Sequence, residues 1–445
     1  MAGAENRKAA GEREVSIQRG MLEAEGPVRF ADKLLIGLFL AAIAAPLCDG
    51  WLRPSSERAM VAEHRRPNPP PVLELKTEAL TEYPRQFNAW YGDTFGLRDK
   101  LVRLHNSIHW FVLGISPTPT LVLGQGDWVE FTWFNTIPVY RGVAGFEARE
   151  LEDWRALLEY RRDWLAKRGI AYVFALAPVK AEVYPERLPA RFDRVGPTRR
   201  EQFFEHMRAH SGVDVADFTE RLREARRADG GADDEVYYRL GVHWTDRGIL
   251  AGYQELLRHV QAKFPEHQAA LEPWESDDFA LQPAPNAGDS WAWRLYMNDL
   301  LPQHPVDLVP VRPRKSRFVP DPAAGEGRHR YEFVNQDATL PNCMVLGDSF
   351  SEPMSEFLAE HFAHTIGYRN VSIDAATVAQ DDPDVVIQLF NERCLVSQDP
   401  RELLERAKRE LGPLDAEVAP RVRVPFAVRD PAAEFAASSD VRLRI

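Results

Sequence analysis

One serine lies where an apolar run stops and a helical pattern begins. The run Cys343–Phe350 reads Cys-Met-Val-Leu-Gly-Asp-Ser-Phe, and apolar residues recur at helical spacing after it. A serine hydroxyl at a strand-to-helix turn is exposed and lies beside backbone N–H groups of the new helix. Acyl chemistry needs a nucleophile and an oxyanion site in such a place. The pattern predicts Ser349 as a nucleophile, with Gly347 and Asp348 supporting the turn and the oxyanion site.

The same tripeptide, Gly-Asp-Ser, occurs a second time at 288–290. This copy follows the segment Gln282–Asn286, which contains two prolines, and no strand pattern precedes it. We interpret it as a loop. Context therefore separates the two copies, and only Ser349 has the features of a nucleophile.

A serine nucleophile needs a base within hydrogen-bond reach, and histidine is the usual choice at neutral pH. His243 is the best candidate among the twelve histidines, because a helical pattern begins just after it, near Thr245. A side chain in that position projects from the edge of a fold. The alternative is a histidine that only packs at a helix start.

These residues need a scaffold, and the hydrophobic pattern predicts one. Apolar strand patterns alternate with amphipathic helix patterns from about residue 121 onward, which is typical of an α/β domain. The predicted strands are 121–123, 129–131, 170–177, 213–215, 343–347 and 384–390; the predicted helices are 150–168, 198–210, 245–260, 351–362 and 401–411. The segment 276–335 is rich in proline and glycine, so we expect an irregular loop or insertion there.

Composition excludes some functions. A net charge of −12, without a long run of Lys or Arg, argues against nucleic acid as a partner. Three cysteines cannot form a disulfide framework, and we expect Cys343 and Cys394 to be buried thiols. His361 and His364 are three apart in a predicted helix but have no third ligand nearby, so we expect no metal and no cofactor.

The N-terminal part carries a membrane signal. Leu34–Cys48 is an uncharged apolar run, and Trp51 follows it as an interfacial anchor. We expect a transmembrane anchor at 33–52, with a cleaved signal peptide as the alternative. A cytoplasmic, disordered tail at 1–32 would precede it, and a proline-rich linker at 53–80 would follow. A catalytic domain at 81–400 and a C-terminal helix and tail at 401–445 complete the expected organisation.

The chain resembles the alginate O-acetyltransferase group of SGNH-hydrolase-like proteins. Six segments carry the resemblance in the family's order: 93–99 (Asp-Thr-Phe-Gly-Leu-Arg-Asp), 122–128 ending in Trp, 177–189 with Pro-Val-Lys and Tyr-Pro-Glu, 243–244 (His-Trp), 346–350, and 391–393 (Asn-Glu-Arg). The resemblance implies a flavodoxin-like parallel sheet flanked by helices. It also implies an inner-membrane, single-pass protein whose periplasmic domain acetylates an exopolysaccharide, with a membrane-bound acyltransferase as the partner that delivers acetyl groups.

Two features concern the order and completeness of the catalytic residues. His243 precedes Ser349 by 106 residues (349 minus 243), the permuted order of this group. The family's triad aspartate lies two residues before the histidine, where this chain has Gly241. Losing that carboxylate typically costs on the order of 10⁴ in kcat, roughly 5 kcal/mol. Asp246, Asp289 and Asp348 are the candidate substitutes, although Asp246 has a structural alternative as a helix-start residue and Asp348 as a turn residue.

These observations favour a serine-dependent O-acetyltransferase acting on a polysaccharide. Flat aromatic and polar side chains are expected to contact the sugar, namely Trp128, Trp244, Trp291 and Lys180. Two alternatives remain open. One is a carbohydrate esterase of the same fold, with water as the acceptor. The other is a catalytically impaired polysaccharide-binding or assembly protein, suggested by Gly241.

Overall fold

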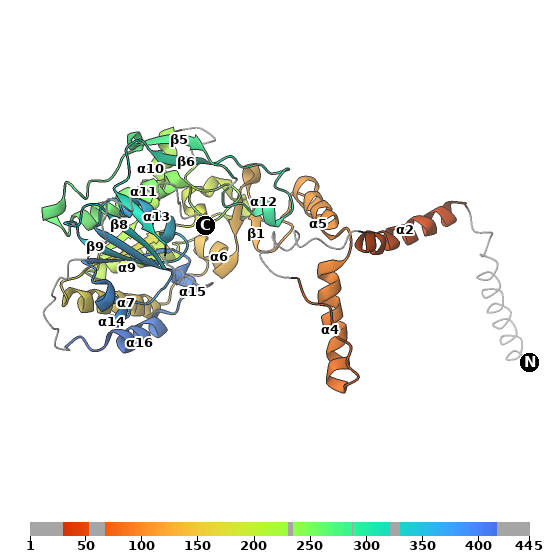
Figure 1. The fold of residues 1–445 in the computed structure, drawn as a ribbon, viewed down its shortest axis with the longest axis horizontal. Coiled ribbons are helices and arrows are strands. Elements are labelled where there is room, and N and C mark those ends of the chain that lie inside the picture. The colour runs from red at the N-terminus through yellow and green to blue at the C-terminus, as the bar shows by residue number, and fades with distance from the viewer. Residues whose placement is uncertain (1–29, 53–66, 230–234, 287, 321–329, 416–445) are drawn as a thin grey trace, which may run out of the picture. The chain divides into compact units, whose positions relative to one another are not determined.

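The computed structural model describes residues 30–52, 67–229, 235–286, 288–320 and 330–415 (Figure 1). The chain divides into two units. The first comprises Met1–His105 with Arg294–Tyr296, and the second comprises Asn106–Trp293 with Met297–Ile445. All of the candidate catalytic residues belong to the second unit.

The described part of the first unit is mainly helical. Its helices are α2 (Phe30–Leu52), α4 (Thr77–Thr94) and most of α5 (Arg98–Ser107). We expected a transmembrane anchor at 33–52; α2 covers that segment, but within the described ranges no helix is long and apolar enough to cross a membrane. The expected anchor is therefore not supported. The expected tail at 1–32 lies almost entirely outside the described residues, as does the first half of the expected linker.

The second unit is built on a sheet of seven described strands. Their order is β4 (Val215–Asp217), β3 (Ala171–Ala177), β11 (Val385–Asn391), β9 (Asn342–Gly347), β10 (His364–Tyr368), β8 (Arg330–Asn335) and β7 (Ser316–Val319). Neighbours from β4 to β10 are parallel, whereas β8 and β7 continue the sheet in antiparallel register. The predicted α/β fold with a mostly parallel central sheet is thus confirmed.

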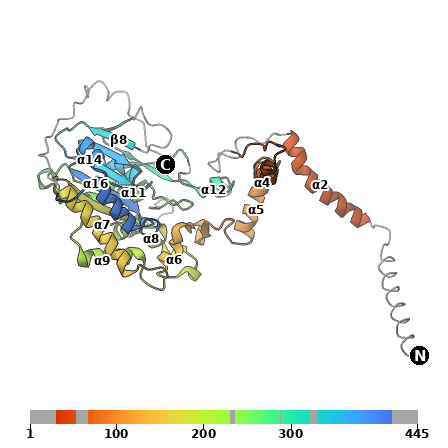
Figure 2. The same ribbon diagram turned by 90° about the horizontal axis from the view of Figure 1, so that it is seen from below.

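Helices cover both faces of this sheet, so its central strands are apolar on both sides. Along β3, Val173 and Ala175 pack on one face, while Tyr172 and Phe174 pack on the other. The first face is covered by α11 (Asp246–Gln261) and α13 (Ser351–Leu358). The second is covered by α7 (Ala148–Ala166), α9 (Arg199–His210), α14 (Ala375–Asp381) and α16 (Pro400–Leu411). Figure 2 shows α7 and α9 side by side.

The helix expected beyond the catalytic domain is part of its core. Helix α16 packs along α7, and Leu403, Ala407 and Leu411 join the same apolar cluster as the sheet. The Trp164 indole N–H also donates to the Leu411 carbonyl at 2.6 Å. The compact domain therefore continues beyond residue 400.

The segment 276–335 was predicted to be irregular, and that prediction is wrong in part. It contains β5 (Phe279–Pro283) paired with β6 (Val306–Pro310), a short helix α12 (Trp291–Arg294), and the strands β7 and β8. Strands β5, β6 and β7 are edge strands with mostly exposed or half-exposed residues, and β8 alternates buried with half-exposed residues. All four therefore lack the continuous apolar pattern of the central strands. His364 lies in β10 rather than on a helix with His361, because α13 ends at Leu358.

Smaller elements follow the prediction. The strands β1 (Leu121–Leu123) and β2 (Val129–Phe131) form an antiparallel pair. Cys343 and Cys394 are buried free thiols.

The C-terminal end of α11 provides a test of stability against pH. His259 Nδ1 lies 2.6 Å from Asp214 Oδ1, just before β4, and Glu255 lies one turn back on the helix. Hydrogen bonds with Asp214 and Glu255 raise the pKa of His259 to about 9, against the opposing effect of burial. Because the folded pKa is raised, the stabilisation is complete below about pH 6.5 and is lost as the pH rises through 9.

We expect His259→Gln to reduce the free energy of unfolding below pH 6.5 and to change it little above pH 9, measured by urea unfolding across this range. His210→Gln, at an exposed position, is the matched control. An equal loss at both ends of the range would contradict this origin of the stabilisation.

Candidate active site

The serine turn is held by the aspartate that precedes the nucleophile. Strand β9 ends at Gly347 and α13 begins at Ser351, which places Ser349 in the turn between them. Asp348 Oδ1 accepts from the Phe350 N–H at 2.9 Å, and Oδ2 accepts from the Asn391 N–H at 2.8 Å. Burial raises the pKa of Asp348, and these two hydrogen bonds oppose the rise. Asp348 therefore ties the turn to the end of the neighbouring strand β11.

Glycine is required at 347 by close approach. A Cβ there would lie 2.1 Å from the Leu389 carbonyl oxygen and 2.6 Å from Ser351 Oγ. No side chain fits at this position, so glycine is needed where the backbone turns from β9 toward Ser349. Gly347 and Asp348 both occupy the turn-supporting positions that the sequence predicts.

The structure brings His243 to Ser349. His243 Nε2 lies 2.7 Å from Ser349 Oγ, within the range for proton transfer. The histidine lies at the end of a short turn in which Tyr238 N–H donates to the His243 carbonyl. Thr245 then caps α11 by accepting from the Gly248 N–H. The imidazole ring also packs against Phe350, with ring centroids 5.0 Å apart.

The carboxylate partner of His243 is Asp289. Its Oδ2 lies 2.7 Å from His243 Nδ1 and also accepts from the backbone N–H groups of Val242 at 2.7 Å and His243 at 3.0 Å. Burial would raise the pKa of Asp289, but the hydrogen bond and charge of His243 and the two backbone donors outweigh it and lower the pKa to about 2. The carboxylate is therefore ionised at neutral pH, and Ser349, His243 and Asp289 form a hydrogen-bonded chain with triad geometry.

The absence of a side chain at Gly241 leaves room for Asp289, which is distant in the sequence, beside His243. A Cβ at 241 would lie 2.4 Å from the Asp289 carbonyl oxygen and 2.6 Å from its Oδ2. Asp289 therefore fills the space that a side chain at 241 would occupy. The second Gly-Asp-Ser copy was predicted to be a loop, and Gly288 and Asp289 do lie outside helices and strands. Its aspartate, Asp289, is nevertheless the residue that contacts His243.

The other two candidate carboxylates have structural roles. Asp246 begins α11, and its Oδ2 accepts from the Leu308 N–H at 2.9 Å, which joins the helix to β6. Asp348 holds the serine turn. The structure therefore favours Asp289 alone among the three candidates as the partner of His243.

Lys180 differs from the expectation that it contacts sugar. Its side chain is buried, and Nζ donates to the carbonyls of Tyr238 at 3.0 Å, Arg239 at 3.0 Å and Gly241 at 2.7 Å. Burial lowers the pKa of Lys180 to about 8. The ammonium gathers three carbonyls of the turn that leads into His243, so its role is to position that turn.

Two of the expected sugar-contacting tryptophans are also buried. Trp128 is 3% exposed and Trp244 is 1% exposed, so neither can stack on a sugar ring in this structure. Trp244 instead packs between Phe350 and Phe218 below the site. Trp291 is partly exposed and contacts Phe131 and the exposed Trp133 edge to face. It remains a candidate for sugar binding.

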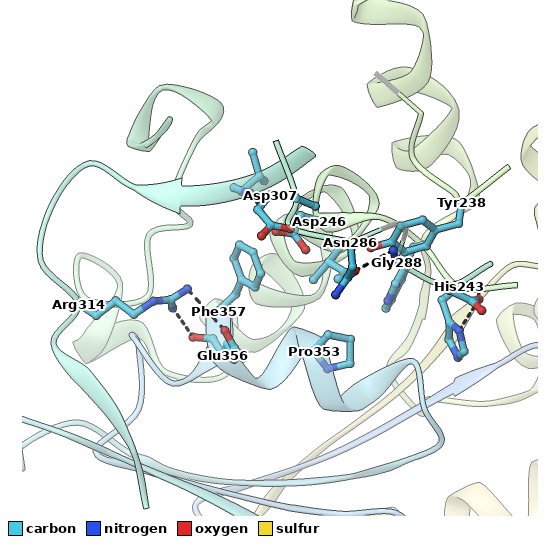
Figure 3. Close-up of a pocket in the computed structure, with 15 residues that line it drawn as sticks. Tyr238, His243, Asp246, Asn286, Gly288, Asp307, Arg314, Pro353, Glu356 and Phe357 are labelled. Carbon is cyan, nitrogen blue, oxygen red and sulfur yellow. Dashed lines mark hydrogen bonds and ion pairs between the residues drawn. The ribbon is translucent and has the colours of Figure 1, made fainter. Parts of the chain in front are cut away.

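A cavity of about 210 Å³ opens beside His243 (Figure 3). Several carboxylates line this cavity. Arg314, which also lines it, donates from Nη1 to the Glu356 carbonyl at 3.0 Å, and its Nη2 lies 3.7 Å from the Glu356 carboxylate. No group of three or more His, Cys, Asp or Glu in the described residues is arranged to hold a metal ion.

Comparison with known proteins now adds to this geometry. Residues 121–375 match the family model described as "SGNH hydrolase-like domain, acetyltransferase AlgX". The chain belongs to this family. The match includes Ser349, His243 and Asp289, so the triad geometry lies within an SGNH-hydrolase-like domain.

Relatives of this family are found in pseudomonads. The chain is 28% identical over 238 residues to a probable alginate O-acetylase AlgJ of Pseudomonas syringae pv. tomato, covering 53% of this chain and 55% of the relative. It is 32% identical over 278 residues to that of Pseudomonas aeruginosa, covering 60% and 63%. The chain thus spans about half to two-thirds of the length of these relatives. The solved O-acetyltransferase domain of Pseudomonas putida AlgJ is 20% identical with a TM-score of 0.41, covering 63% of this chain and 94% of that one.

The role of Asp289 can be measured through the reactivity of Ser349. We expect Asp289→Asn to slow labelling of Ser349 by a fluorophosphonate probe by about 10³–10⁴-fold. The neutral amide neither holds His243 in the tautomer that accepts the Ser349 proton nor stabilises the imidazolium as a carboxylate does. Asp277→Asn, at an exposed position, is the control. Unchanged labelling of Asp289→Asn would contradict the assignment.

The shared space at Gly241 and Asp289 can be tested by exchange. Gly241→Asp alone should abolish labelling of Ser349, because its side chain overlaps Asp289. The double variant Gly241→Asp with Asp289→Gly should label roughly tenfold or more faster than Asp289→Gly alone, since residues in contact couple by about 0.5–3 kcal/mol. Equal labelling of these last two variants would show that the positions do not substitute for one another.

Proposed function

We propose that this chain is an O-acetyltransferase that acts on a polysaccharide through an acetyl-serine intermediate. The observation that carries the proposal is the continuous hydrogen-bonded chain from Ser349 through His243 to Asp289. The names of the pseudomonad relatives support acetyl transfer to a polysaccharide. The resemblance implies a permuted order, with histidine before serine, and His243 precedes Ser349 in this sequence.

In the first half-reaction, His243 Nε2 takes the proton of Ser349 Oγ as the oxygen attacks the acetyl carbonyl carbon. The tetrahedral oxyanion then collapses, the bond to the donor's leaving oxygen breaks, and His243 returns the proton to that oxygen. Asp289 stabilises the imidazolium that forms between these two steps. No protein group in the described residues accepts from the Ser349 N–H, so this donor can face the oxyanion.

The second half-reaction repeats the chemistry with a sugar hydroxyl. His243 takes the hydroxyl proton, the sugar oxygen attacks the acetyl-serine, and Ser349 leaves with the proton from His243. A membrane-bound acyltransferase as acetyl donor and a periplasmic location belong to the same proposal, as the family resemblance implies them. A translational fusion to a reporter that is active only outside the cytoplasm would test the location.

The geometry of the site bears differently on the two alternative functions, an impaired binding protein and a carbohydrate esterase. An impaired binding protein was suggested by Gly241, and Asp289 beside His243 removes that reason. An esterase would share the acetyl-serine and differ only in using water. Acetate release in the presence and absence of a polysaccharide acceptor separates transfer from hydrolysis.

Formation of the intermediate is the direct test. Incubation with a chromogenic acetyl ester should add one acetyl mass to the peptide that contains Ser349, detected by mass spectrometry after acid quenching. Ser349→Ala should lose this adduct and reduce turnover to the uncatalysed rate, whereas Ser397→Ala, at an exposed position, should behave as the parent. An undiminished turnover by Ser349→Ala would refute the proposal.

A further inference from the structure

Three aromatic rings form a cluster on segments that are joined to the turn carrying His243. Phe131, the last residue of β2, is buried, and Trp133 and Trp291 pack on it edge to face with ring centroids 5.4 Å and 4.8 Å away. The two indole rings also contact each other at 80°, with centroids 6.1 Å apart. Each ring is thus held in place by the other two. Trp133 is nevertheless 43% exposed, and Trp291 is partly exposed.

Backbone hydrogen bonds attach this cluster to the triad. Trp291 follows Asp289 by two residues (291 minus 289). Its backbone N–H donates at 2.9 Å to the carbonyl of Leu240, in the turn that carries His243. The Val129 N–H of β2 donates to the preceding carbonyl of the same turn at 3.1 Å. Both segments that carry the rings are therefore joined to the turn that positions the base, and the exposed indoles lie at the border of the site.

A strained turn adds a further exposed ring beside Trp133. Phe134 is 54% exposed, and both Phe134 and Asn135 have positive φ angles, of 54° and 53°. The left-handed region is unfavourable for residues with a side chain, most of all for a bulky one. Neither the strain nor the exposure of a large apolar ring stabilises the fold. Backbone strain of this kind is concentrated at positions that contact ligands.

The same turn borders the edge of the sheet from which the nucleophile emerges. The turn, Trp133–Asn135, lies next to α15 (Cys394–Ser397), which begins just after β11 ends at Asn391. The Asn391 N–H is the donor that Asp348 accepts beside Ser349. The exposed rings are therefore placed between the turn that carries His243 and the strand end that holds the serine turn.

Exposed aromatic rings in this place suit a sugar ring. A pyranose has apolar C–H faces and a rim of hydroxyl groups, so it can stack on a flat ring while its hydroxyl groups stay hydrated. Trp133 and Trp291 stand at 80° to each other, so one indole can cover a sugar face while the other contacts its rim. Such stacking requires no charge on the sugar, and it selects for ring shape rather than for a particular substituent.

We propose, resting on the acetyltransferase function above, that Trp133, Phe134 and Trp291 form an aromatic platform that binds the sugar unit next to the one that reacts. His243 takes the proton from a hydroxyl of one unit, and the platform holds a neighbouring unit of the same acceptor chain. Because a neighbouring unit exists only in an oligomer, the platform makes the enzyme select chains over single sugars.

Dependence on acceptor length is the direct test. The full chain, with a chromogenic acetyl ester as donor, receives single sugars or oligomers of a mannuronate series and of a cello-oligosaccharide series. Mass spectrometry measures ester-linked acetyl on each acceptor. In a series that is acetylated, we expect kcat/KM for oligomers to exceed that for the single sugar by about tenfold or more, as for a stacked aromatic anchor. Equal values would overturn the inference, and so would acetyl-Ser349 that reacts only with water.

Variants assign the length preference to the platform. Trp133→Ala should lower kcat/KM for oligomers about tenfold, mainly through KM, so that the ratio of oligomer to single sugar falls toward one. Trp133→Phe, which keeps a flat ring, should retain most of the ratio. Trp293→Ala, which removes an exposed tryptophan outside the platform, is the matched control and should keep the parent ratio. A defect in folding would lower both acceptors alike and leave the ratio unchanged.

The possible failures are distinguishable. If the parent forms no acetyl-Ser349, the acetyltransferase function itself is refuted. If the parent acetylates oligomers in preference to single sugars and Trp133→Ala keeps that preference, the function stands and the platform is refuted.

Discussion

The arrangement of this site depends on one carboxylate oxygen. Asp289 Oδ2 receives three donors, from the imidazole of His243 and from the backbone N–H groups of Val242 and His243. These bonds fix the ring that faces Ser349 and the turn that carries it. Gln303 supports the same loop, because it donates to the Asp289 carbonyl and accepts from the Leu240 N–H. These hydrogen bonds tie the Asp289 loop, which lies outside helices and strands, to the turn that carries His243.

The sheet supplies the other half of the geometry. Strands β9, β11 and β3 are parallel neighbours, so the loops at their carboxyl ends meet at one edge, where α/β folds commonly bind ligands. Ser349 follows β9, and the carboxylate of Asp348 links its turn to Asn391 at the end of β11. Lys180 follows β3 and gathers the carbonyls of the His243 turn. The sheet thus positions both reacting groups from its central strands.

The sequence predicted most of the helices and strands whose apolar residues recur with a regular period. The strands around Ser349 and the helix start after His243 have clear apolar periods, because both faces of the sheet are buried. Asp289 could be named as a candidate but not chosen, since its contact with His243 spans 46 residues of chain and depends on a loop without a period. Its signal was indirect: a glycine at 241, where the resembled family has an aspartate, leaves space for a carboxylate from elsewhere. Lys180 was misassigned because spacing alone does not reveal that a lysine is buried.

Two carboxylates near the same serine illustrate how the environment divides their roles. Burial acts to raise the pKa of both Asp289 and Asp348. For Asp289, the bond to His243 and two backbone donors prevail, and the carboxylate stays ionised wherever the histidine can act as a base. For Asp348, two backbone donors only partly offset burial, and they come from the serine turn at Phe350 and from the end of β11 at Asn391. Divergent pKa values in adjacent acids mark different functions. Here the difference separates the group that stabilises the imidazolium from the group that shapes the nucleophile's turn, and it arises because, of the two carboxylates, Asp289 is the one hydrogen-bonded to the His243 ring.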